Sequence, residues 1–290
     1  MSTSNVAGMV TIYHSERTVL ANVRSYINQV GKLYVVDNSE SPDLELIHEL
    51  QAISPAIVCL PSRGNEGLAV ALNRAAQQAI TEGFKHLLTM DDDSSLPAGA
   101  VEQLLATINS ADNIGMVAGG IVDPHSKKAK RPPKRPEIRQ ELTLITAGSI
   151  LKLEAYQKAG PFQDELFIDW VDLEYSFRLS RHGYILLTNP QIRVFHRLGI
   201  KKKTYLLGFI PYRWRSHNPI RLYYKFRNGT YILNRDADII PERYKRRFYK
   251  ELRSNIFKII LAESNKKRFF SLIKRALRDG KAGNLGKLTE

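Results

Sequence analysis

Short apolar runs alternate with longer amphipathic segments from Val6 to Asp91 of this 290-residue chain. An apolar run of about four to eight residues predicts a buried strand, and apolar residues at helical spacing predict a helix. The predicted strands and helices alternate strictly, with the bounds Val6–Tyr13, Glu16–Gln29, Leu33–Val36, Leu44–Ile53, Ala56–Leu60 and Leu68–Ile80, followed by a strand that begins at His86. This order predicts an α/β fold in which right-handed crossovers join the strands of a parallel sheet.

Polar residues gather where these predicted strands end. Tyr13 ends the first strand, Asp37 follows the second, and Asp91–Asp93 follow the strand that begins at His86. Ligands of parallel α/β sheets bind beyond the carboxyl ends of the strands, so these side chains share the rim where a ligand is expected. Three adjacent carboxylates repel one another unless a cation or a set of donors lies among them, which suggests a divalent metal site. The alternative is a solvated acidic turn that caps the following helix.

A glycine-bracketed turn, Arg63–Gly67, precedes the helix predicted to begin at Leu68. Backbone amides at the N-terminus of a helix suit a phosphate group. The turn lacks the glycine spacing of a dinucleotide-binding fingerprint or a P-loop, so it predicts only a contact on the nucleotide side of a site.

The alternation breaks down after a helix predicted at Ala100–Ile108 and a strand predicted at Ile114–Ala118. Pro124–Arg139 holds four prolines and seven Lys or Arg residues, a composition that cannot form a core element and predicts a mobile loop over the site. Further strands are predicted at Leu142–Ala147 and Ile150–Leu153.

Asp169 and Asp172 lie in a second acidic segment, close in sequence to Phe167 and Trp170. Asp172 could cap a helix predicted to run to His182. Partial desolvation beside aromatic rings raises the basicity of a carboxylate, which suits Asp172 to proton abstraction.

Glu174 and Arg178 are four residues apart on the same predicted helix, a spacing typical of an ordinary surface ion pair. His196 follows two predicted strands, Tyr184–Leu187 and Ile192–Phe195. A lone histidine after a strand is more often structural than a metal ligand, unless acids converge on it.

The excess basic charge of the chain, +14 overall, comes from its C-terminal third. Residues 1–200 hold 19 Lys and Arg against 22 Asp and Glu, whereas residues 201–290 hold 24 against 7. Such a segment could face nucleic acid, an anionic membrane or a phosphorylated ligand.

The apolar residues of this C-terminal third recur at helical spacing: Phe248, Leu252, Ile256, Ile260, Phe269, Phe270, Ile273 and Leu277. Basic amphipathic helices of this kind either lie on an anionic membrane surface or pack on a catalytic domain.

The composition argues against a secreted or membrane-spanning protein. The single cysteine, Cys59, lies in an apolar run and predicts a core thiol in a reducing compartment. No signal-like segment opens the chain and no run of about 18 apolar residues occurs, so we expect a folded cytoplasmic protein. No nucleic-acid-binding module is recognisable, so no nucleic-acid partner is expected.

The polar positions together resemble one family. They are Tyr13, Val36–Ser39, Asn65–Gly67, Asp91–Asp93, Trp170–Tyr175 and His196, and the likeness extends to Asn218–Asn228. In this order and spacing they resemble the family 2 glycosyltransferases with the GT-A fold, and among these the bacterial rhamnosyltransferases and their galactofuranosyltransferase relatives. The resemblance implies a Rossmann-like, mainly parallel sheet with helices on both faces. It further implies a catalytic domain over residues 1–200, with a nucleotide-sugar half near 1–120 and an acceptor half near 121–200. A basic, aromatic-rich helical region over 201–290 would be a membrane-surface or acceptor-binding element.

The resemblance also implies a role for each matching position. It implies donor contacts from Tyr13, Asp37, Asn65, Asp91 and Asp92, metal ligation by Asp91, Asp93 and His196, and acceptor or substrate contacts from Gly148, Ser149, Asp169, Trp170, Glu174 and Arg227. Asp172 would be the catalytic base, and the metal would be Mn²⁺ or Mg²⁺. Many relatives carry an acid immediately before this base, where the present chain has Val171, so the roles of Asp169 and Glu174 stay open.

The implied activity is metal-dependent, inverting transfer of L-rhamnose from dTDP-L-rhamnose to a cell-surface polysaccharide, an O-antigen or a capsule. Transfer of galactofuranose from UDP-galactofuranose is the alternative within the same class. A protein of another class, a non-catalytic nucleic-acid or lipid binder on a transferase scaffold, would also account for the basic C-terminal region. A lipid-linked glycan acceptor implies a peripheral location at the inner face of a bacterial inner membrane.

Overall fold

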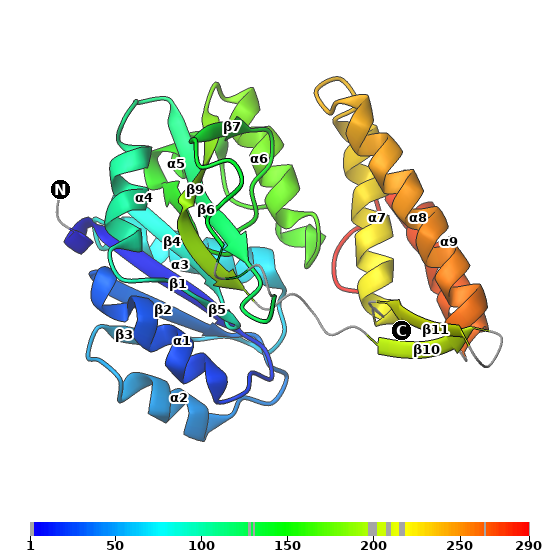
Figure 1. The fold of residues 1–290 in the computed structure, drawn as a ribbon, viewed down its shortest axis with the longest axis horizontal. Helices are drawn as coiled ribbons and strands as arrows, with labels where there is room; N and C mark the ends of the chain where they lie inside the picture. The colour runs from blue at the N-terminus through cyan, green and yellow to red at the C-terminus, as the bar shows by residue number, and fades with distance from the viewer. Residues whose placement is uncertain are drawn as a thin grey trace. The chain divides into compact units, whose positions relative to one another are not determined.

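The computed structural model describes residues 3–126, 129, 131–196, 202–206, 210–214, 218–263 and 265–289. The chain divides into two compact units, the first formed by Met1–Asp164 and Val171–Arg197 and the second by Glu165–Trp170 and Leu198–Glu290. Figure 1 shows the first unit in blue to green, and the second contains the helices drawn in yellow to red.

The N-terminal half of the first unit has the alternating order predicted from the apolar pattern. Its strands are β1 (Val6–Ile12), β2 (Lys32–Asp37), β3 (Ile57–Leu60) and β4 (His86–Asp91), and its helices are α1 (Thr18–Tyr26), α2 (Leu44–Gln51) and α3 (Leu68–Thr81). The four strands are parallel and lie in the order β3-β2-β1-β4. The predicted fold class is therefore confirmed here, with element bounds that differ by a few residues.

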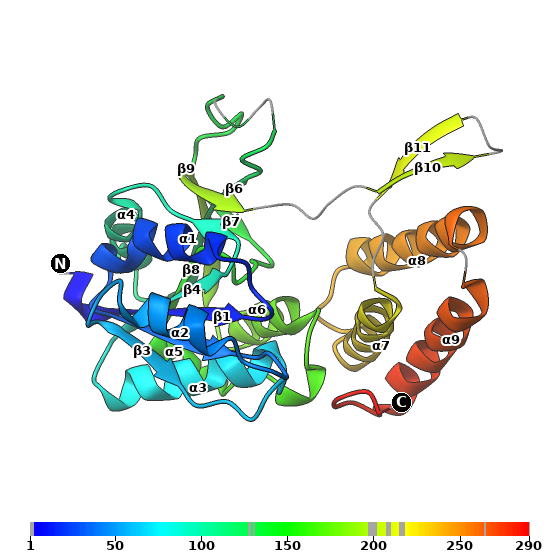
Figure 2. The same cartoon turned by 90° about the horizontal axis from the view of Figure 1, so that it is seen from below.

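The strands of this half are apolar on both faces because both faces are covered. Val6 and Val10 of β1 belong to a core cluster with residues of α1, α2 and α4 (Ala100–Ile108). Ala7 and Met9, which point to the opposite face, are equally buried. Figure 2 shows α1 and α4 on one side of the sheet and α3 on the other.

The rest of the sheet mixes strand directions. β8 (Ser149–Lys152) enters antiparallel between β4 and β6 (Ile114–Val122), and β9 (Ile185–His196) continues parallel to β6. The short strands β5 (Ser94–Ser95) and β7 (Arg139–Glu141) both pair antiparallel with β9. The remaining helices of the unit are α5 (Leu153–Ala159) and α6 (Val171–Arg181). The parallel arrangement is thus limited to the N-terminal strands and the β6–β9 pair.

The strand predicted at Leu142–Ala147 is wrong. The backbone of this segment bonds to side chains instead of a neighbouring strand: the Leu144 amide donates to Ser176 Oγ at 3.1 Å and the Thr146 carbonyl accepts from Thr89 Oγ1 at 2.5 Å. The apolar side chains Leu144 and Ala147 are nevertheless buried. Burial without a ladder produces the same sequence pattern as a strand.

The two strands predicted at Tyr184–Leu187 and Ile192–Phe195 are one strand, β9. The register of β9 against β6 shifts between Asn189 and Arg193, which leaves Pro190 out of the ladder. Proline has no amide hydrogen to donate, and a bulge lets the strand continue past it. Pro190 therefore interrupts the ladder without ending the strand.

The second unit carries the predicted C-terminal helices. They are α7 (Pro219–Arg235), α8 (Glu242–Ala262) and α9 (Lys266–Ala282), preceded by a hairpin of β10 (Lys202–Leu206) and β11 (Ile210–Trp214). Gly280 of α9 lets this helix approach α7 closely, since a Cβ there would lie 2.4 Å from the Arg227 carbonyl oxygen. Among the described residues, none of the helices is both long and apolar enough to cross a bilayer.

His86 gives the first unit a pH-dependent stability. It is buried at the start of β4, opposite Lys152 of β8. Burial, helped by the charge of Lys152, lowers the pKa of His86 from 6.5 to about 4. The unfolded chain therefore takes up a proton below pH 6.5 that the folded chain takes up only near pH 4, and stability falls as pH falls through this window.

We expect this histidine alone to cost about 3 kcal/mol of unfolding free energy between neutral pH and pH 4. In urea unfolding at pH 7, 5.5 and 4, His86→Gln should lose that much less stability on acidification than the wild-type protein. His48→Gln, at an exposed site on α2, is the control and should follow the wild type. Equal acid sensitivity of His86→Gln and wild type would contradict the assignment.

Candidate active site and metal centre

The carboxyl ends of three parallel strands form the rim of the candidate site. In the registers of β1 with its two neighbours, Ile12 lies opposite Asp37 and Thr11 lies opposite Asp91. Tyr13 follows β1 directly, so it shares this rim with the two aspartates. The rim of the sheet thus holds side chains from segments as much as 78 residues apart (13 to 91).

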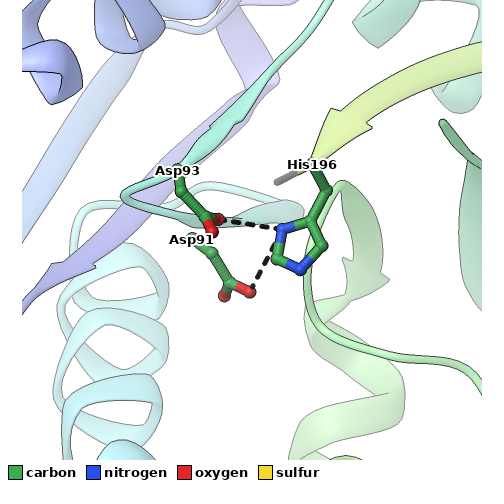
Figure 3. A group of neighbouring side chains, drawn as sticks. All are labelled: Asp91, Asp93 and His196. Atoms are coloured by element: carbon green, nitrogen blue, oxygen red, sulfur yellow. Dashed lines mark ion pairs between the residues drawn. The ribbon is translucent and has the colours of Figure 1, made fainter. Parts of the chain in front are cut away.

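Asp91, Asp93 and His196 converge on one point of this rim (Figure 3). His196 Nδ1 lies 2.9 Å from Asp93 Oδ1 and 3.9 Å from Asp91 Oδ2. The histidine reaches the acids because β5, which follows them, pairs with the end of β9 in a register that sets Ser94 opposite His196. Ser94 Oγ and His196 Nδ1 are 2.8 Å apart. This strand pairing supplies the convergence of acids that a ligand histidine requires.

The three side chains suit a divalent cation. One possible ligand atom from each lies within 4.8 Å of the other two, and all three residues are partly exposed. Two carboxylates and an imidazole fit Mn²⁺ or Mg²⁺, and the nitrogen ligand favours Mn²⁺ modestly. The hydrogen bond with Asp93, followed by the charges of Asp93, Asp91 and Asp92, raises the pKa of His196 against the effect of burial.

Asp92 is turned to a different partner from its two neighbours. Its carboxylate accepts a short hydrogen bond from Ser15 Oγ, and its carbonyl accepts from Asn22 Nδ2 at 2.8 Å. Burial raises the pKa of Asp92. These bonds tie the turn after β4 to the segment before α1 and to α1 itself, so the contacts of Asp92 are structural in this arrangement.

Glu40 links the loops that follow β1, β2 and β3, a role the sequence analysis missed. Its carboxylate contacts His14 Nε2 at 2.9 Å, Asn65 Nδ2 at 3.1 Å and the Tyr13 hydroxyl at 3.5 Å. Hydrogen bonding by its own backbone, assisted by His14 and Asn65, lowers the pKa of Glu40 to about 2. Asp37, next to this cluster, is buried and accepts from the Ser39 amide at 2.8 Å. The only sequence signal for Glu40 was its place just beyond the end of a strand.

Asp172 lies in the first turn of α6, which begins at Val171 and ends at Arg181. It is half-buried, and its Oδ1 accepts from the Leu173 amide at 2.9 Å. A carboxylate in the first turn is favoured by the helix dipole. Asp172 is therefore inside the helix instead of at the capping position considered from the sequence.

Glu174 and Arg178 form a pair, but the expectation of an ordinary surface pair is wrong. Glu174 is only 2% exposed, and its two oxygens accept from Arg178 Nε at 3.1 Å and Nη2 at 2.6 Å. Arg178 also donates to the Pro161 carbonyl at 2.5 Å. The spacing on the helix predicts the pair, but a four-residue spacing carries no information about the burial of Glu174.

Gly148 and Ser149 form the entry to β8. Gly148 has a φ of +68°, and a Cβ there would lie 2.4 Å from a Val194 methyl carbon. Ser149 is fully buried and donates to the Ile145 carbonyl at 2.5 Å. Their contacts hold the strand in place and leave the Ser149 hydroxyl inside the protein.

The other predicted acceptor residues belong to the second unit. Asp169 and Trp170, with Phe167, have left-handed backbones, at φ of +60°, +69° and +65°. Asn228 Nδ2 lies 2.8 to 2.9 Å from the carbonyls of Leu166, Ile168 and Asp169. Left-handed backbone is costly for residues other than glycine and persists where its surroundings hold it.

Arg227, next to Asn228, is buried against the same loop. It donates to the carbonyls of Glu165 and Leu166 at 3.1 and 3.2 Å. Asp169 accepts from Arg221 Nε at 3.3 Å, so its carboxylate points to α7. Arg227 therefore has a structural role within the second unit.

Comparison with known proteins identifies what this arrangement is similar to. Residues 9–164, more than half of the chain, match the model of glycosyl transferase family 2. The dTDP-rhamnosyl transferase RfbF of Shigella flexneri is 24% identical over 259 residues, which cover 80% of this chain and 81% of that protein.

Two solved structures have the same fold. They are GalNAc-T7 with UDP, GalNAc and Mn²⁺ (TM-score 0.59, 15% identity) and the mannosyltransferase PcManGT of Pyrobaculum calidifontis with GDP-Man and Mn²⁺ (TM-score 0.58, 14% identity). The matches cover 96% and 98% of this chain, and 56% and 76% of the respective chains, so this chain spans little more than half of the first. The expected GT-A fold is thereby confirmed.

The metal centre predicts a binding phenotype for its ligands. We expect His196→Ala and Asp93→Asn each to weaken Mn²⁺ binding about a hundredfold, because each removes one donor atom. Isothermal titration with MnCl₂ measures this directly. His182→Ala, at an exposed histidine beyond the end of α6, is the control and should titrate like wild type. Unchanged affinity in both ligand variants would exclude this group as the metal centre.

The loop before α6 predicts a stability effect. Asn228→Ala should destabilise the protein by about 2 kcal/mol, because buried carbonyls lose their shared donor. Asn234→Ala removes an exposed amide from the same helix and should be neutral. Urea unfolding measures the stability of the two variants. If Asn228→Ala is as stable as Asn234→Ala, the left-handed backbone of this loop does not depend on the Asn228 side chain.

Proposed function

The chain belongs to glycosyl transferase family 2, and from this premise we propose that it is a metal-dependent inverting enzyme that transfers L-rhamnose from dTDP-L-rhamnose. The observation that carries the proposal is the convergence of Asp91, Asp93 and His196 at the strand rim that also holds Asp37 and Tyr13. A cation site beside a candidate nucleoside site is what a diphosphate-linked donor requires.

The donor would lie along the rim. Tyr13, Asp37 and Asn65 would hold the nucleoside, and Glu40 would fix the loops that present Tyr13 and Asn65. Asp91 would lie near the ribose and the metal, and Asp92 would keep the turn in place through Ser15. The order of contacts along the rim would then run from the base to the diphosphate.

Asp91, Asp93 and His196 would hold Mn²⁺ or Mg²⁺ against the diphosphate. When bound, such a cation neutralises the charge that develops on the leaving group. Asp172 would take the proton from an acceptor hydroxyl, whose oxygen attacks the anomeric carbon from the face opposite the diphosphate. The new glycosidic bond forms as the bond to the diphosphate breaks, so the anomeric configuration inverts and the nucleoside diphosphate leaves.

The acceptor would be a cell-surface glycan, an O-antigen or capsule, carried on a lipid. Residues 1–200 would form the catalytic domain, and 201–290 would be a region for the acceptor or the membrane. Asp169 and Trp170 are the better candidates for acceptor contacts, because Glu174, Arg227 and Ser149 are buried. The enzyme would work peripherally at the inner face of a bacterial inner membrane.

The sugar nucleotide is chosen by analogy with the relative named for dTDP-rhamnose. A donor screen tests it: with Mn²⁺ present, dTDP-L-rhamnose should be hydrolysed or transferred faster than UDP-galactofuranose and other nucleotide sugars. A preference for UDP-galactofuranose would identify that nucleotide sugar as the donor and leave the assignment as a glycosyltransferase unchanged. Tight DNA binding without any thermal stabilisation by dTDP or UDP would support the non-catalytic alternative, which the +17 balance of residues 201–290 (24 against 7) motivates.

Asp172 provides the mechanistic prediction. We expect Asp172→Asn to bind dTDP with unchanged affinity and to lose transfer by about a hundredfold or more, because only the proton acceptor is removed. Asp112→Asn, at an exposed turn of the first unit, is the matched control and should keep full activity. Turnover near wild type in Asp172→Asn would reassign the base to Asp169 or Glu174.

A further inference from the structure

One face of α8 in the second unit exposes basic and apolar side chains in sequence. Lys250, Arg253 and Phe257 are exposed at spacings of three and four residues, and the exposed Ile260 and Leu261 follow three and four residues after Phe257. Residues with this spacing lie on the same face of a helix. The face is basic toward the N-terminal part of α8 and apolar over its last turns.

The apolar part is unusually open to solvent. Phe257, Ile260 and Leu261 are 60%, 49% and 41% exposed, while Leu252 and Ile259 of the same helix pack inward. Three large apolar side chains on one exposed face form a contiguous patch, and such patches mark interaction sites more often than scattered single residues do.

The start of α9 repeats the pattern. Phe270 is 37% exposed, and Lys266, Lys267 and Lys274, all exposed, occupy the same side of the helix at spacings of three to four residues. Figure 2 shows the end of α8 in orange and the start of α9 in red, joined at the same end of the two helices. Both sides of this junction thus present an aromatic ring among lysines and arginines.

A groove along α8 has the same mixed character. It measures about 620 Å³, and it is lined by three cations, Arg246, Lys250 and Arg253, by one acid, Glu242, and by the apolar surfaces of Tyr249, Leu252 and Ile256. From Glu242 to Phe270 the chain carries ten Lys or Arg residues against three Glu. The surface is strongly positive, so its partner should be negative and partly apolar.

We propose that the α8–α9 face, defined by Lys250, Arg253, Phe257, Ile260, Leu261 and Phe270, docks on the surface of an anionic lipid bilayer. The apolar side chains would enter the boundary between headgroups and acyl chains, and the flanking cations would contact lipid phosphates. Charge favours a bilayer over a second copy of the chain, because two copies would bring like charges together. The inference extends the peripheral location within the proposed function.

Flotation with vesicles tests the docking face. The protein should float with vesicles that contain phosphatidylglycerol, bind neutral phosphatidylcholine vesicles much more weakly, and be released by high salt. Replacing Phe257, Ile260 and Leu261 together by serine should weaken binding about tenfold or more. Replacing Arg246, Lys250 and Arg253 by glutamine should weaken binding to the anionic vesicles roughly a hundredfold.

Leu44→Ser is the control for the apolar substitutions. Leu44 is 66% exposed at the start of α2 in the first unit, between Asp43 and Glu45, so its loss should not affect vesicle binding. Thermal unfolding should give similar curves for all variants, because the substituted side chains are exposed. Wild-type protein that fails to float with anionic vesicles, or variants that float as well as wild type, would overturn the proposal.

Two further measurements separate this proposal from others. Sedimentation measures whether the protein is a dimer. If the wild type is a dimer that Phe257→Ser dissociates, and neither protein binds vesicles, the proposal is overturned and the face is assigned to a second copy of the chain. Stabilisation by dTDP with Mn²⁺ is measured in the absence of lipid. If it persists while flotation fails, the docking face is wrong and the transferase proposal stands.

Discussion

The repulsion among three successive carboxylates is the constraint on which the first unit depends. The chain resolves it by turning the acids to different partners: Asp92 toward Ser15, and Asp91 and Asp93 toward His196. The division is natural at the end of a strand, where neighbouring side chains point to opposite sides. Asp92 thereby stabilises the turn, and Asp91 and Asp93 stay available to bind a cation. The chemistry of the site follows from this separation.

The histidine that completes the group is supplied by strand pairing across about a hundred residues. β5 is only two residues long, yet its pairing with the end of β9 sets Ser94 opposite His196. β9 can reach that position because it continues past Pro190 through a register shift, instead of ending there. The mixed second half of the sheet therefore has a direct function: it returns a strand to the rim formed by the parallel half.

The elements that sequence predicted best are those whose signal is local. Alternating apolar runs set the N-terminal strands, because a strand covered on both faces needs a continuous apolar run. Leu142–Ala147 was misassigned since its backbone bonds to Ser176 and Thr89, far away in sequence. Glu40 was missed because a polar loop residue has no periodicity. The roles inferred for the site residues came from the family resemblance, and the contact between Asp93 and His196 needed the three-dimensional structure.

The loop before α6 belongs to the second unit, although the chain continues from it directly into α6 of the first. Trp170 is the last residue of a segment assigned to the second unit, and Val171 opens α6 in the first. Asn228 and Arg227 of α7 donate hydrogen bonds to the carbonyls of this loop. These bonds offset the conformational free energy of its left-handed residues. Asp172 follows this loop within two residues of the chain, so the proposed base is next in sequence to a backbone segment whose left-handed conformation is stabilised within the second unit.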